Sequence, residues 1–138
     1  MLAAFLGGCD VHFGYYANDW KTADAATDVF HEYMRQGKFS SMYDMGSAAL
    51  KQQQTEQEFV QAAEQGVQIF GPIKVARQLR AACMPNQVRL VYQTEFQNGN
   101  GSERLVWQVR DDKAELISYQ IVPGEVDVST LPDSSCAK

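Results

Sequence analysis

The sequence has few of the residues that build metal or redox centres. Its 138 residues include two histidines and three cysteines. His12 and His31 have no partner at the spacing of metal ligands, and no Cys-x-x-Cys pair occurs. We therefore expect neither a metal nor a cofactor.

Long apolar runs and an excess of positive charge are also missing. No apolar stretch approaches the roughly 20 residues that cross a bilayer, so we expect no internal transmembrane helix. The formal net charge of −5 gives no electrostatic reason for a polyanionic partner such as nucleic acid. The hydrophobic fraction of 45% is ordinary for a folded protein, and the length fits one domain.

Residues 73–122 alternate between apolar and polar side chains, as half-buried strands do. Turn-forming residues, such as Asn98-Gly99-Asn100-Gly101, separate four such stretches. The pattern predicts four antiparallel strands joined in sequence. The residues on the apolar parity are Val75, Leu79, Ala81 and Cys83, then Leu90, Tyr92 and Phe96, then Leu105, Trp107 and Val109, and last Ile117, Tyr119 and Ile121.

Three segments before the strands have helical spacing of their apolar residues. The first begins at Thr22 and ends at Gly37, and a short one covers 38–45. The third begins with a capping box at Thr55 and ends at Gly71, and Gly66 in its middle indicates either a break or close helix packing. Residues 51–54 are interpreted as a solvated link. Three N-terminal helices packed on a four-stranded antiparallel sheet make an α+β domain.

This order of elements, with several residue types, matches a known superfamily. The matching residues are Phe30, Tyr33, Gly37, Lys38, Phe39, Tyr43, Thr55, Glu58, Phe59, Gly71 and Pro72. Over residues 22–122 the chain resembles the nuclear transport factor two-like superfamily, and within it small bacterial exported or lipoprotein domains of unknown function. The resemblance implies a cystatin-like cone, in which a curved sheet wraps around the first helix. The superfamily includes enzymes such as ketosteroid isomerase.

The first residues resemble the end of a bacterial lipoprotein signal peptide. Leu6-Gly7-Gly8-Cys9 matches a lipobox, in which the cysteine becomes the lipidated terminus, although a positively charged region is missing. The alternative is an apolar N-terminal segment of a cytosolic domain. On the first interpretation residues 1–9 are the remnant of the signal and 10–21 an aromatic-rich tether, while 123–138 form an extended C-terminal tail. The protein would then be exported, anchored by lipid at the bacterial membrane and facing the periplasm or the cell exterior.

Cys83 and Cys136 remain as a pair if Cys9 carries lipid. An even remainder in an exported protein suggests a disulfide, which would attach the tail to the sheet. The alternative is a buried thiol at Cys83 and a free thiol at Cys136.

Catalytic residues cannot be placed inside the predicted cone. Glu95, Glu103 and Glu115 are assigned to the polar parity, and His31 to the solvated side of the first helix. General acid/base chemistry needs such a group in a buried site, so we expect no enzymatic activity.

Two kinds of binding surface are predicted instead. The leading hypothesis is a protein interface, or a homodimer contact, on the outer sheet face, formed by Arg89, Val91, Gln93, Arg104, Val106 and Gln108. The alternative is a pocket inside the cone for an apolar or anionic ligand, lined by Arg77, Tyr92, Thr94, Trp107 and Tyr119. Arg77 could instead lie near the end of the sheet, with its guanidinium in water.

We predict that the native protein carries lipid on Cys9, because a lipobox-like sequence precedes a folded domain. Metabolic labelling with a fatty-acid analogue should mark the wild type and leave the Cys9→Ala variant unlabelled. Equal labelling of the two proteins would contradict the prediction.

Overall fold

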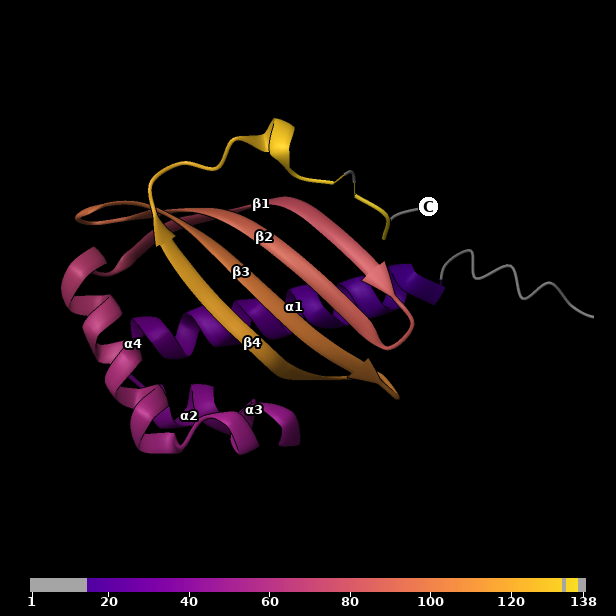
Figure 1. The fold of residues 1–138 in the computed structure, drawn as a ribbon, viewed down its shortest axis with the longest axis horizontal. Helices are drawn as coiled ribbons and strands as arrows, with labels where there is room; N and C mark the ends of the chain where they lie inside the picture. The colour runs from indigo at the N-terminus through magenta and orange to yellow at the C-terminus, as the bar shows by residue number, and fades with distance from the viewer. Residues whose placement is uncertain (1–14, 133, 137–138) are drawn as a thin grey trace, which may run out of the picture.

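The molecule has two layers, with helices packed against one face of an antiparallel sheet (Figure 1). The computed structural model describes residues 15–132 and 134–136. The predicted lipidation site Cys9 therefore lies outside the described residues. Helices come first along the chain and strands second, which confirms the predicted α+β class.

Four helices precede the sheet, where the sequence predicted three. They are α1 (Tyr15–Arg35), α2 (Phe39–Asp44), α3 (Ala48–Gln53) and α4 (Glu56–Phe70). The first helix was expected to begin at 22, so the described part of the predicted tether is helical instead. The predicted link at 51–54 was also wrong in part, because α3 continues to Gln53. Ser47 caps the start of this helix by accepting a hydrogen bond from the Leu50 amide. The cap predicted at Thr55 is confirmed at the start of α4.

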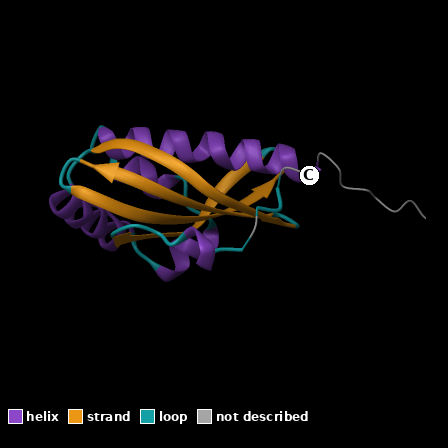
Figure 2. Ribbon diagram, turned by 90° about the horizontal axis from the view of Figure 1, so that it is seen from above, coloured by secondary structure: helices purple, strands orange, loops and turns teal. Residues whose placement is uncertain are grey.

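The sheet contains β1 (Ile73–Met84), β2 (Gln87–Phe96), β3 (Gly99–Arg110) and β4 (Lys113–Pro123), paired in the order β1-β2-β3-β4. Helix α1 lies along one face of this sheet (Figure 2). We call the face toward α1 the inner face and the opposite one the outer face. The buried positions on β2 and β3 include Leu90, Leu105 and Trp107, as the alternation predicted. The main core therefore lies between α1 and the inner face.

The alternation fails in β1 because two bulges change which side chains face the core. The register shifts once between Ile73 and Val75 and again between Gln78 and Arg80. Gln78 is therefore opposite Tyr92 on the inner face. Val75 was predicted to be on the apolar side, yet it is exposed on the outer face. A similar bulge occurs in β4, where Ile117 is the extra residue. Leu116 therefore lies opposite Trp107 and is fully buried, although Ile117 was the residue predicted to face the core.

The C-terminal tail crosses the outer face and returns to the edge of β1. The Gln93 side chain donates a hydrogen bond to the Gly124 carbonyl and accepts one from the Val126 amide, both in the tail. Further along, the Ser135 amide donates to the Ala81 carbonyl of β1. Figure 1 shows this segment in yellow beside the sheet.

The predicted disulfide between Cys83 and Cys136 is confirmed. The two α-carbons lie 5.0 Å apart, within the usual range for a disulfide. Cys136 is buried against the main core. The bond therefore fixes the end of the tail at β1.

We predict that loss of this bond lowers the free energy of unfolding by about 4 kcal/mol, because the bond closes a long loop in the unfolded chain. Cys83→Ser, Cys136→Ser and the double variant should lose nearly the same amount in urea unfolding, since each removes the same cross-link. Losses that add in the double variant would contradict the prediction.

Candidate functional site: a buried carboxylate beside an apolar cavity

The inner face holds a carboxylate that is fully buried and surrounded by donors. Glu103 of β3 is 0% exposed. The Nε2 atom of His31, on α1, lies 3.1 Å from each carboxylate oxygen. Thr94 of β2 donates to Oε1 through its hydroxyl, and the Tyr119 hydroxyl of β4 donates to Oε2 at 2.5 Å. Both oxygens therefore have two partners each.

These contacts keep Glu103 ionised although it is buried. Burial alone raises the pKa of the carboxyl group, but the hydrogen bond and the electrostatic interaction with His31 oppose this effect. Together with the hydrogen bonds from Thr94 and Tyr119, they hold the pKa of Glu103 below its ordinary value. Burial and the Glu103 charge raise the pKa of Tyr119 well above its ordinary value. Tyr119 is therefore a neutral donor to a carboxylate.

The sequence-based placement of both charged partners was wrong. Glu103 has the same parity as Leu105 and Trp107, so the alternation of β3, continued toward its start, already indicated an inward position. His31 was assigned to the solvated side of its helix but is only 3% exposed. It lies four residues after the buried Thr27, which is the spacing of one helix face.

A second polar network joins the first half of α1 to the sheet. The Trp20 Nε1 group donates to Gln78 Oε1 at 2.8 Å, and the Gln78 amide donates to Asp24 at 2.9 Å. The Tyr92 hydroxyl donates to the same Asp24 oxygen at 2.9 Å. Burial is the main effect that raises the pKa of the Tyr92 hydroxyl above the ordinary value for a tyrosine. These side chains are satisfied by one another, which suits a structural contact.

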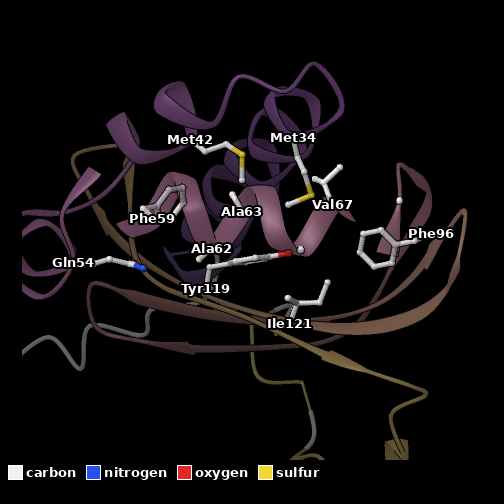
Figure 3. A pocket seen from close by; sticks show the side chains of 12 residues that line it. Met34, Met42, Gln54, Phe59, Ala62, Ala63, Val67, Phe96, Tyr119 and Ile121 are labelled. Atoms are coloured by element: carbon white, nitrogen blue, oxygen red, sulfur yellow. The ribbon is translucent and has the colours of Figure 1, made fainter. Parts of the chain in front are cut away.

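An apolar cavity of about 150 Å³ lies between α4 and the β4 side of the sheet (Figure 3). Tyr119 lies across it, with Ala63 on one side and Ile121 on the other (Figure 3). The lining residues are Met34, Met42, Gln54, Phe59, Ala62, Ala63, Gly66, Val67, Gly71, Phe96, Tyr119 and Ile121.

Small residues on α4 are the reason for this space. Ala62, Ala63 and Gly66 line the cavity, and a β-carbon added to Gly66 would meet no atom within 4 Å. The predicted break at Gly66 does not occur, because α4 is continuous from Glu56 to Phe70. The glycine leaves room without interrupting the helix.

The predicted pocket residues are divided among different places. Tyr119 lines the cavity, Thr94 binds Glu103, and Tyr92 belongs to the second network. Trp107 is fully buried and donates to the Thr27 hydroxyl at 2.9 Å. Arg77 is exposed opposite Gln93 on the outer face, so its proposed role in an inner pocket was wrong. The first bulge of β1 is the cause, because it reverses the faces of the residues that follow.

The six residues of the predicted interface lie on the outer face. Arg89 and Arg104 are exposed there, whereas Val91 and Val106 are half-buried. Gln93 is already bound by the C-terminal tail. Binding of a partner protein to this face therefore stays a prediction. The side chain of Gln93 is already hydrogen-bonded to the tail and is not free to bind such a partner.

Tyr119 connects the polar cluster to the cavity. It is the one member of the cluster that lines the cavity, and its hydroxyl proton is donated to Glu103. The lone pairs of its oxygen can still accept a hydrogen bond. The arrangement can therefore hold an apolar group, with the tyrosine hydroxyl fixed in position by a buried charge.

Comparisons with protein-family models, curated proteins and solved structures found no match to this chain. Among the described residues, no helix is long and apolar enough to span a membrane. The same part of the chain has no group of three or more His, Cys, Asp or Glu side chains placed to hold a metal ion.

We predict that Glu103→Gln lowers the free energy of unfolding at neutral pH by about 3 to 5 kcal/mol, because it leaves three buried partners without their acceptor charge. The folded-state pKa is lowered, so the carboxylate stabilises the fold above its ordinary pKa of 4.5. This stabilisation is lost as the pH falls through the folded-state pKa. The deficit of the variant, measured by urea unfolding, should therefore shrink in acid.

Glu95→Gln is the matched control, since Glu95 is exposed on the neighbouring strand. It should change stability by no more than about 0.5 kcal/mol. If Glu103→Gln were as mild as this control at neutral pH, the assigned role of the carboxylate would be wrong.

Proposed function

We propose that this domain binds a small apolar molecule in the cavity between α4 and the sheet. The observation that carries the proposal is an apolar cavity of about 150 Å³ whose wall includes a hydroxyl held by a buried carboxylate. An enclosed apolar cavity of roughly this volume in another protein accepts a single aromatic ring, and this cavity offers a similar volume although it is partly open to solvent. A ring or a short alkyl chain is therefore the expected occupant.

The packing around the cavity supports binding. Apolar side chains from α1, α2, α4 and the sheet converge on it, which is typical of sites for small molecules. Tyr119 cannot turn away without breaking its hydrogen bond to the buried Glu103 carboxylate, so the wall of the cavity is fixed before a ligand arrives.

Binding fits this arrangement better than catalysis does. The sequence indicated no inward acidic residue, which was the reason to expect no enzyme. Glu103 is such a residue, because it is fully buried on the inner face. Its two oxygens, however, are already occupied by His31, Thr94 and Tyr119, and it does not line the cavity. A general base must reach its substrate with a free lone pair, which this carboxylate does not offer.

An interaction with another protein through the outer face is a second candidate. The register supports it, since Arg89 lies opposite Val106 and Arg104 lies opposite Val91. Two arginines therefore flank two half-buried valines, a mixture common at protein interfaces. Export, a lipid anchor and membership of the nuclear transport factor two-like superfamily also remain proposals.

We predict that benzene binds the wild type and that Ala63→Leu abolishes this binding, because the longer side chain fills the cavity. Titration followed by protein NMR measures the affinity. Thermal unfolding should show a melting temperature that rises with benzene for the wild type and not for the variant.

Gln68→Leu adds a leucine to an exposed position of the same helix and outside the cavity lining, so it serves as the control. It should bind benzene as the wild type does. A wild type that shows no saturable binding, or equal binding by Ala63→Leu, would refute the cavity as the site.

A further inference from the structure

A second hollow adjoins the apolar cavity and has a different chemistry. Its volume is about 270 Å³, and it lies between β4 and the segment that joins α3 to α4. Three residues, Gln54, Phe59 and Tyr119, line both spaces. The other lining residues of the second hollow are Leu50, Gln53, Glu58, Ile117 and Ser118. The two spaces are therefore neighbours along these three side chains.

Gln54 offers an uncommitted amide at the junction of the two spaces. Its backbone carbonyl accepts a hydrogen bond from the Tyr43 hydroxyl at 2.8 Å, which fixes the main chain at this point. Its side chain is half-buried and makes no hydrogen bond within residues 15–132 and 134–136. In Figure 3 the side-chain nitrogen of Gln54 points toward Tyr119. The amide is accessible to solvent, so it can exchange a hydrogen bond with water for one with a ligand.

The charges near the two spaces limit what that ligand can be. The lining of both spaces contains no lysine, arginine or histidine, whereas Glu58 lines the second hollow. An anionic group placed there would lose hydration without gaining an opposite charge. An uncharged or cationic polar group would not meet this penalty. The anionic ligand considered from the sequence depended on Arg77, which is on the other face of the sheet.

From this arrangement we infer that the ligand is a small amphiphile with a hydroxyl, amide or ammonium head. Its apolar body occupies the cavity, and its head lies in the second hollow, bound to the Gln54 amide near Glu58. This inference rests on the proposed function, because the cavity must first hold the apolar body.

Four probes separate the two claims. Benzene tests the cavity alone, while hexan-1-ol, hexylammonium and heptanoate share a six-carbon alkyl chain and differ in the head. Affinities for the wild type are measured by NMR titration at pH 7. Hexan-1-ol and hexylammonium should bind at least about fivefold more tightly than heptanoate, which corresponds to roughly one hydrogen bond or one exposed ion pair.

Two variants assign the preference to named side chains. Gln54→Met keeps the length of the side chain and removes the amide, so affinity for hexan-1-ol should fall about fivefold while benzene binding is unchanged. Gln52→Met is the control, because Gln52 is exposed on α3 and lines neither space.

Glu58→Gln should reduce the advantage of hexylammonium over heptanoate about threefold. Its control is Glu64→Gln, which changes the net charge equally from an exposed position of α4 outside both linings. Glu64→Gln should leave the ratio unchanged.

The outcomes distinguish the two claims. If benzene binds but the three probes with different heads bind equally, or heptanoate binds most tightly, the inference is overturned and the proposed function stands. Unchanged hexan-1-ol affinity in Gln54→Met would also overturn the inference. If none of the four probes binds, both claims fall.

Discussion

The burial of the Glu103 carboxylate is the constraint on which the arrangement of helix and sheet depends. A charge removed from water must be surrounded by donors, and here the donors come from three different elements. His31 belongs to α1, Thr94 to β2 and Tyr119 to β4, while Glu103 itself is on β3. A helix that shifted along the inner face would remove His31 from the carboxylate and leave only the two donors of the sheet. The cluster therefore holds α1 against the sheet and also fixes its position along the sheet.

The same constraint determines one wall of the cavity. Tyr119 gives its hydroxyl proton to Glu103, so its ring is held across the space that small side chains of α4 leave open. The other lining residues are mostly apolar and could repack more freely. Tyr119, fixed by its hydrogen bond, lies opposite the small residues Ala63 and Gly66 of α4. The space between them therefore keeps its shape, whereas freely moving side chains would close it.

The tail fixes the opposite face of the sheet. The bond between Cys83 and Cys136 joins it to β1, and Gln93 holds it where it crosses β2. A buried charge thus fixes the centre of the inner face, and the disulfide fixes the end of the tail at the β1 edge of the same core. These two fixed points lie on different elements and act through different physical effects.

The sequence by itself determined the class of fold, the order of strands and most inward positions of β2 and β3. Local effects are sufficient for these features, because alternation, turn residues and caps act between near neighbours in the chain. Even Glu103 could have been placed correctly by extending the parity of Leu105. The preference for polar residues outside misled that assignment.

Only the tertiary structure decided the bulges, the cluster and the two adjoining spaces. A bulge depends on how two strands pair, so nothing in β1 alone indicated that Arg77 faces outward. The contact between His31 and Glu103 joins residues far apart in the chain, and a cavity is a property of packing between elements. These features depend on distances in space between residues that do not share a local pattern, and a single sequence does not contain those distances.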